Sequence, residues 1–248
     1  MSEKKWYSDL LFHNNKVKTN DGLTPLLDMF ENETHFVKHF VENTIFFNKE
    51  HIEAQQVEIQ NKLENNEKIH VRFSTKCQEH FYYKAENGRG FSVKKFKTRS
   101  EAQKFSIKNN LYFRDTHGKE ILVLIDKDGN YEVRKQIEKY TKIIVSQGTK
   151  VSNYSNYTIS HVWENTTTHP LYFTALWNIV LIPSYLAFIL DKSDKHSEFS
   201  RKIKLIIRGL CLDFYSPEIL SKEMKDKLKM ALVFSEKIKQ ENFHIQFV

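Results

Sequence analysis

The feature that most constrains the fold is an uncharged run of 20 residues, Leu171 to Leu190 (LYFTALWNIVLIPSYLAFIL). Its length matches the roughly 20 residues that a transmembrane helix needs. However, Asn178 and Pro183 lie inside the run, where a bilayer makes an unpaired amide costly and proline removes a helical hydrogen bond. We therefore expect no membrane span. The run predicts a buried strand that ends near Pro183, followed by a core helix.

The composition permits one large core or two modest ones, because the chain has 248 residues and 40% of them are hydrophobic. Its 38 Lys and Arg residues outnumber its 31 Asp and Glu residues, which gives a formal charge of +7. A polyanion such as nucleic acid is attracted to such a charge. The same excess is common in Lys-rich and Asn-rich proteins from AT-biased genomes, so both interpretations stay open.

The cysteines and the N-terminus indicate the compartment. Cys77 and Cys211 lie far apart and form no CxxC pair, so neither a disulfide framework nor a zinc knuckle is indicated. No apolar stretch follows Lys4 and Lys5, as it does in a secretory signal. We expect a protein that stays in the reducing cytoplasm.

Changes of hydrophobic period divide the chain into three expected regions. Apolar residues recur at helical spacing between Thr24 and Glu64, which predicts at least two helices and a helical region over 1–66. Residues 67–148 alternate instead and predict a β-rich, basic region. Residues 149–248 hold the motif described below and end in two expected helices, Ser200 to Leu212 and Pro217 to Glu241.

Turn and cap residues place the elements of the β-rich region. Asn87 to Gly90 predicts a hairpin turn, and Asp128-Gly129 predicts a second hairpin within Glu120 to Val133. Thr98 and Glu101 have capping-box spacing and predict a helix that runs to about Asn109. We interpret Asp126 to Gly129 as turn residues and not as a calcium loop, since the distal Glu is missing.

Cations interleave with aromatic residues around the first hairpin, a pattern typical of a strand-borne nucleic-acid surface. The aromatic residues are Tyr82, Tyr83, Phe91 and Phe96. The candidates for DNA contact are Lys84, Arg89, Lys94, Lys95, Lys97 and Arg99. Three further cations, Lys202, Lys204 and Arg208, lie off the apolar face of a C-terminal helix, and we expect a solvated face there, with phosphate contact as the alternative.

One stretch holds a pattern of residues suited to phosphodiester cleavage. Tyr157 to Trp163 (YTISHVW) predicts a strand that carries His161, and Trp177 to Ile182 (WNIVLI) predicts a second strand that begins with Asn178. Pro183 then ends the strand and opens a short helix, Ser184 to Lys192. The order is strand with His, loop with His169-Pro170, strand with Asn, and helix.

This order resembles the HNH, or ββα-metal, endonuclease family over about 37 residues. The resemblance implies that His161 is the general base and that Asn178 hydrogen-bonds the loop backbone and orients it. It also implies a divalent ion, Mg²⁺ or Mn²⁺, because the negative charge that develops on the phosphate needs neutralising. An imidazole with an ordinary pKa near 6.5 can accept a proton at working pH.

The metal ligands depart from the family pattern. Ser160 stands before His161, where the family places an acid or a His, and Ala187 stands where many members carry a ligating His or Asn. Asp191 lies one helical turn beyond Ala187 and offers a carboxylate on the same face. Either Asp191 serves as a ligand, or the usual ligand has been lost. The loss can be natural or an engineered substitution, and the otherwise intact motif favours the engineered substitution.

Other interpretations remain. His161 can be a strand histidine that a backbone carbonyl satisfies, with Asn178 a turn residue and the apolar run a core element. His35 and His39 have helical metal spacing, but we expect them to be solvated. No P-loop, GxGxxG or GxSxG motif is present.

The sequence therefore predicts an α+β protein that acts as a site-specific double-strand DNA endonuclease of the restriction type. A palindromic target would make it a homodimer. A non-catalytic nucleic-acid-binding protein is the alternative.

Overall fold

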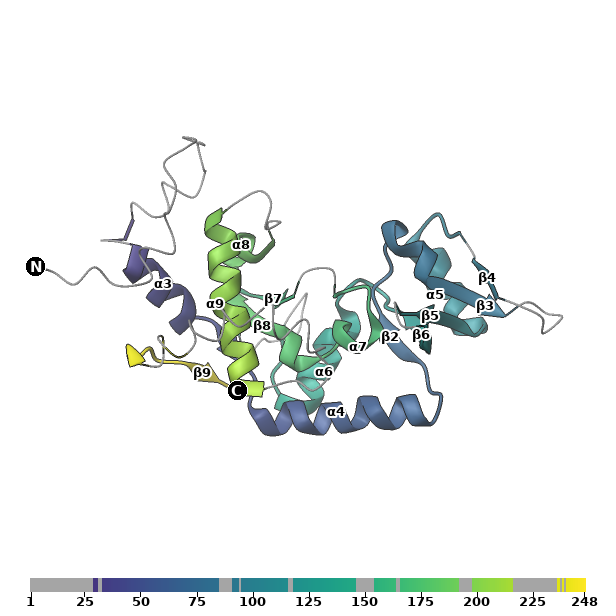
Figure 1. Cartoon of the computed structure of the whole chain (residues 1–248), viewed down its shortest axis with the longest axis horizontal. Helices are drawn as coiled ribbons and strands as arrows, with labels where there is room; N and C mark the ends of the chain where they lie inside the picture. The colour runs from purple at the N-terminus through teal and green to yellow at the C-terminus, as the bar shows by residue number, and fades with distance from the viewer. Residues whose placement is uncertain are drawn as a thin grey trace, which may run out of the picture. The chain divides into compact units, whose positions relative to one another are not determined.

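The computed structural model describes residues 29–30, 33–84, 91–93, 95–115, 118–145, 154–163, 166–191, 198–215, 236, 238 and 240–248. The chain combines helices with strands that form two small sheets, which confirms the α+β class (Figure 1). The chain divides into two compact units: Met1–Phe46, Asn156–Val162 and Val180–Val248 form the first, and Phe47–Ser155 with Trp163–Ile179 form the second. The three regions expected from the sequence stay predictions.

The first unit holds a four-stranded sheet in the order β7-β8-β1-β9. Its strands are β1 (Ile45–Phe46), β7 (Tyr157–His161), β8 (Ile179–Pro183) and β9 (Gln246–Phe247). β1 runs antiparallel to β8 and parallel to β9, with Ile45 opposite Leu181 and Gln246. The helices are α3 (Glu33–Glu42), α8 (Ala187–Asp191) and α9 (Glu198–Tyr215).

The uncharged run supplies one of the two interior strands of this sheet, β8. Every residue of β8 is buried, and the strand ends at Pro183 as predicted. Within the described residues, no helix combines the length and the apolar character needed to cross a membrane. The helix after Pro183 is shorter than expected, because residues 184–186 form a turn in which Leu186 N donates to the Pro183 carbonyl.

The second unit is built on a five-stranded sheet in the order β2-β6-β5-β3-β4. The strands are β2 (Ile69–Val71), β3 (Phe81–Lys84), β4 (Phe91–Val93), β5 (Leu111–Arg114) and β6 (Glu120–Ile125). β2 and β6 are parallel, and the other pairs are antiparallel. The helices are α4 (Lys49–Glu64), α5 (Arg99–Lys108), α6 (Tyr131–Thr141) and α7 (Pro170–Phe173), with 3₁₀ turns η1 (Thr75–His80) and η2 (Leu176–Asn178).

The core of this unit lies on one face of the sheet. The strand side chains that alternate inward include Ile69, Val71, Leu111 and Val123, and Ala102 of α5 packs with them. Phe96, which the sequence placed on a basic binding surface, is also part of this core, because it packs edge-on against Phe73. The binding interpretation of Phe96 is therefore wrong.

The capping residues predicted for α5 are confirmed. The hydroxyl of Thr98 accepts a hydrogen bond from Glu101 N at 3.2 Å, and the Glu101 carboxylate accepts one from Lys97 N at 3.0 Å. The first bond satisfies an N–H group that the first turn of a helix leaves without a partner, and the second binds the residue before the N-cap. Strands β3 and β4 pair on either side of the first predicted hairpin turn, whose tip lies outside the described residues.

The second predicted hairpin is wrong. β6 is followed by α6 and not by a returning strand, since the Asp126 carboxylate starts that helix. It accepts hydrogen bonds from Gly129 N, Tyr131 N and Glu132 N, at 2.9, 3.0 and 2.9 Å. A carboxylate is favourable at this end of a helix, because the free N–H groups give it a partial positive charge. Asp-Gly thus marks a loop that leads into a helix here.

Candidate functional site

The strand, strand and helix that resemble the HNH motif lie together in the first unit. β7 and β8 are neighbours in its sheet, and α8 packs against β7. Two contacts join the start of β7 to the turn after β8: Ser184 N donates to the Asn156 carbonyl at 2.7 Å, and the hydroxyls of Thr158 and Ser184 lie 3.1 Å apart. The chain segments predicted for the motif therefore have the ββα order in space.

His161 is the last residue of β7 and is half-buried. The backbone next to it is held by Arg208 of α9, whose Nε donates to the Val162 carbonyl at 3.0 Å. Arg208 is 9% exposed and Lys204, one turn earlier, is 3% exposed. The expected solvated face is therefore wrong for these two cations, because α9 turns them inward.

Asn178 lies at the end of η2 in the second unit and is fully buried. Its Oδ1 accepts a hydrogen bond from Trp163 N at 3.0 Å. Its Nδ2 donates to Thr166 Oγ1 at 2.8 Å and to the Tyr172 carbonyl at 2.9 Å. This amide thus closes the loop between Trp163 and Asn178 from inside, and its effect on the orientation of His161 stays a prediction.

The positions expected to hold a metal are poor in ligands. Ser160 is 3% exposed, and within the described residues its hydroxyl has no hydrogen-bond partner. Ala187 is 6% exposed and offers only a methyl group. Asp191 ends α8, but its side chain lies outside the described part. No group of three or more His, Cys, Asp or Glu residues suited to a metal occurs in the part that the structure describes, and the metal site stays a prediction.

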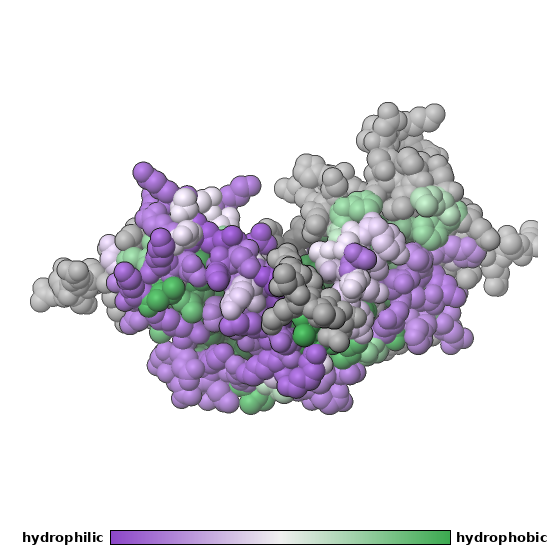
Figure 2. Space-filling view, turned by 180° about the vertical axis from the view of Figure 1, so that it is seen from behind, coloured by the Kyte–Doolittle hydropathy of each residue, from purple (hydrophilic) through white to green (hydrophobic). Residues whose placement is uncertain are grey.

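The basic residues predicted to contact DNA belong to the second unit. Lys95 and Lys97 are exposed, and Arg99 is partly exposed at the start of α5. Lys84 ends β3, while its side chain, Arg89 and Lys94 lie outside the described residues. Hydrophilic residues cover most of the described surface in Figure 2.

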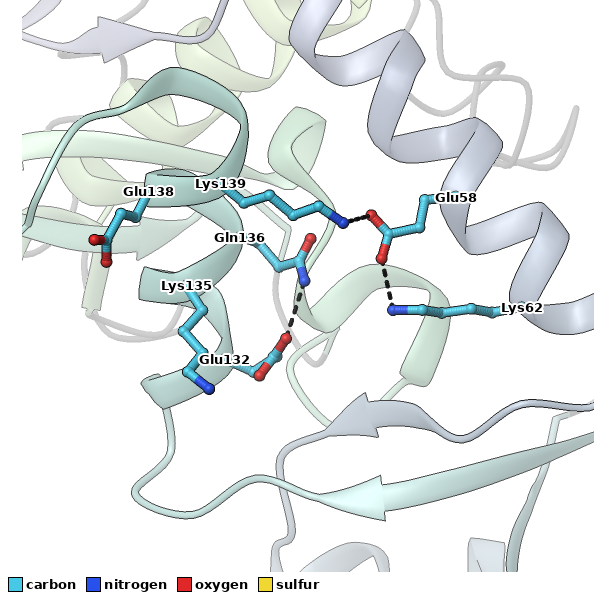
Figure 3. A pocket seen from close by; sticks show the side chains of 7 residues that line it. All are labelled: Glu58, Lys62, Glu132, Lys135, Gln136, Glu138 and Lys139. Atoms are coloured by element: carbon cyan, nitrogen blue, oxygen red, sulfur yellow. Dashed lines mark hydrogen bonds and ion pairs between the residues drawn. The ribbon is translucent and has the colours of Figure 1, made fainter.

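A separate pocket of about 430 Å³ lies on the second unit (Figure 3). Its lining comes from α4 and α6: Glu58, Lys62, Glu132, Lys135, Gln136, Glu138 and Lys139. Glu58 is bound by Lys62 at 2.7 Å and by Lys139 and Tyr140. Burial acts to raise the pKa of Glu58, but these hydrogen bonds outweigh it and lower the pKa to about 2.

Two acids of this pocket, Glu58 and Glu132, thus already have partners inside the protein. Glu132 accepts a hydrogen bond from Gln136 at 2.9 Å and lies 3.7 Å from His70. Burial lowers the pKa of His70, although Glu132 opposes the shift. No motif in the sequence indicated this cluster, because its members come from three separated elements. It is an ion-pair network with little free charge for a ligand.

His39, expected to be solvated with His35, is instead half-buried in the first unit. Its Nε2 lies 2.7 Å from the Tyr185 hydroxyl oxygen, and its ring is tilted against Phe30. His35 is exposed as expected. The two therefore do not form a metal pair.

These observations define the class as an α+β protein that divides into two compact units, each with a small sheet. Residues 47–247 match the family described as Uncharacterised protein PM1201, and the chain belongs to that family. No curated protein and no solved structure matches the chain.

Proposed function

We propose that the chain is an HNH-type endonuclease that cuts double-stranded DNA at specific sites. The observation that carries the proposal is the Asn178 amide, which accepts the hydrogen bond of Trp163 N two residues after His161. This is the backbone contact that the resemblance assigns to the middle Asn. The order of β7, β8 and α8 supports the same conclusion.

In the proposed reaction, His161 is the general base. Its imidazole removes a proton from water, the water oxygen bonds to phosphorus, and the bond to the 3′ oxygen breaks with that oxygen taking up a proton. Arg208 and Asn178 act as positioning residues, because they hold the backbone at Val162 and Trp163. They fix where the strand that carries the base ends.

A Mg²⁺ or Mn²⁺ ion belongs to the proposal, since it would neutralise the charge that develops on the phosphate. The resemblance assigns Ser160 to the ligand position that precedes the base in β7, and Asp191 of α8 is the proposed carboxylate. Ala187 occupies the position where a ligating side chain would complete the set. A cytoplasmic homodimer acting on a palindromic site completes the proposal.

The test is cleavage of mixed-sequence duplex DNA with Mg²⁺ or Mn²⁺. We expect discrete fragments from Ala187→Asn, and none when His161→Ala is added to it. His35→Ala serves as a matched control, because His35 is an exposed His on helix α3 of the same unit. Cleavage that survives His161→Ala would overturn the assignment of the base.

A second candidate is a non-catalytic nucleic-acid-binding protein. Ala187 and the lack of a ligand cluster in the described residues favour it. Binding of duplex DNA by every variant, with no cleavage in either metal, would establish this candidate and reduce His161 to a structural residue.

A further inference from the structure

Two arginines of the second unit converge on one point. Arg72 follows β2, and Arg99 is the first residue of α5. A Cβ atom placed on Gly129 would lie 2.8 Å from Nη1 of Arg99 and 3.6 Å from Nε of Arg72. Gly129 has φ +97°, and it brings no side chain into this space. The two guanidinium groups therefore lie side by side over the loop that precedes α6.

Neither guanidinium has a carboxylate partner among the described residues. Other arginines of the unit do, since Arg114 binds Glu120 and Arg134 binds Asp128, each at 2.6 Å. Two like charges repel when they are brought together, and an anion between them offsets that cost. The arrangement thus leaves positive charge that the described protein does not neutralise with an ion pair.

The two acids of the loop that holds Gly129 have other partners. Both oxygens of Asp126 accept backbone hydrogen bonds at the start of α6. Asp128 accepts hydrogen bonds from Arg134 and from Asn130 N. Within the described residues, these carboxylates therefore form no ion pair with Arg72 or Arg99.

The topology explains why the arginines meet. β2 and β6 are parallel neighbours with Val71 opposite Ile125, so Arg72 and Asp126 leave the sheet at the same edge. Arg72 is exposed, Arg99 is partly exposed, and Lys97 beside it is exposed. A ligand can therefore reach the pair from solvent, and a third cation lies close in sequence.

We propose that Arg72 and Arg99 together bind a phosphate group of the nucleic-acid backbone. A guanidinium presents N–H donors in a fork that matches two phosphate oxygens, and two forks can hold one phosphate from both sides. The identity of the ligand as DNA rests on the proposed function. The site extends the basic surface expected from the sequence, which contained Arg99 but not Arg72.

The test measures binding without cleavage. Fluorescence anisotropy of a labelled duplex, with Ca²⁺ in place of Mg²⁺, compares the native chain with Arg72→Gln/Arg99→Gln over a range of salt concentrations. We expect the double variant to bind at least about tenfold more weakly and to lose about one unit of the slope of log K against log salt. Because the arginines share one phosphate, each single variant should lose most of this.

Arg114→Gln is the matched control, since it removes one positive charge that is already paired with Glu120. It should leave the salt slope unchanged. Thermal unfolding of each variant checks that the unit stays folded, and Arg72→Lys/Arg99→Lys keeps the charge but loses the fork. We expect this variant to recover only part of the affinity. Inorganic phosphate should displace the duplex more than chloride of equal ionic strength does.

The outcomes separate this inference from the nuclease proposal. A double variant that binds as well as Arg114→Gln overturns the phosphate site, even if the native chain or Ala187→Asn cuts DNA. Weakened binding with no cleavage by any form supports the site and overturns the nuclease. A native chain that binds no duplex at low salt overturns the site whatever the cleavage assay shows.

Discussion

Replacing Asn178 by Asp tests the loop closure most directly, because it changes one NH₂ group into an oxygen of nearly the same size. Asn178 Oδ1 keeps its bond from Trp163 N. The new oxygen, however, faces Thr166 Oγ1 and the Tyr172 carbonyl, which both accept from the native amide. Thr166 already donates its proton to the Trp163 carbonyl at 2.6 Å, so it has none for the carboxylate.

The expected loss is large. Two buried hydrogen bonds disappear, at about 1 kcal/mol each, and a buried charge gains no partner, which costs roughly 3 kcal/mol or more when it stays ionised. Together these losses lower the free energy of unfolding by about 5 kcal/mol near pH 8. Near pH 5 protonation is easier and gives the side chain one O–H to donate, so the loss falls to about 2 kcal/mol.

The measurement is urea unfolding followed by circular dichroism at both pH values. Asn61→Asp on α4 is the control, since Asn61 is exposed and its loss should stay below about 0.5 kcal/mol. A loss under about 1 kcal/mol for Asn178→Asp, equal at both pH values, would show that Asn178 is not closed in by these partners.

Three further predictions concern the second unit. Gln55→Leu should lower the free energy of unfolding in urea by about 3 kcal/mol. Buried Gln55 accepts a hydrogen bond from Leu176 N at 2.7 Å and donates one to the Thr174 carbonyl at 2.8 Å, and leucine would leave both backbone groups unpaired. A loss below about 1 kcal/mol would contradict this role of Gln55. Asp126→Asn removes a charge and one acceptor oxygen from the start of α6 and should cost about 1 to 2 kcal/mol, with faster amide exchange confined to that helix; unchanged exchange would refute the capping role. Burial lowers the pKa of His169 to about 4, whereas the unfolded chain takes up this proton near pH 6.5. Stability should therefore fall by roughly 2 kcal/mol as the pH drops from 6.5 to 4. His169→Asn keeps an acceptor for the cap of α7 but does not titrate there, so it should lose that part of the pH dependence.

The sequence predicts elements best where one local signal dominates. Within the uncharged run, a buried strand ends at Pro183 as predicted, and α5 begins where Thr98 and Glu101 can cap it. Helical spacing before Glu64 corresponds to α3 and α4. Each of these depends on neighbours within a few residues, which a single sequence contains.

Long-range partners explain what the sequence does not predict. Arg208 appeared to face water because its partner, the Val162 carbonyl, lies far away in the chain. Phe96 appeared to belong to a binding surface because nothing nearby in sequence shows that it packs on Phe73. The convergence of Arg72 and Arg99 likewise needs the parallel pairing of β2 with β6.

The candidate site is intermediate between these cases. The resemblance chose Asn178, and the structure gives it a backbone contact of the kind expected. It could not indicate that Ser160 would be buried without a described partner. The ligand set of the proposed metal also stays a prediction. A sequence does not show where the carboxylate of Asp191 lies, because that depends on how its short helix packs.

The sheet of the first unit has a consequence for how the protein is made. β1 lies near residue 45, whereas its parallel neighbour β9 begins at Gln246. During synthesis, β1 can pair with β9 only after nearly all of the remaining chain has been made. Pairing between strands so far apart in sequence is slow. Strands exposed during that interval are sites of misassembly, so we expect the second unit, whose segments emerge earlier, to fold first and the yield of native protein to depend on chaperones.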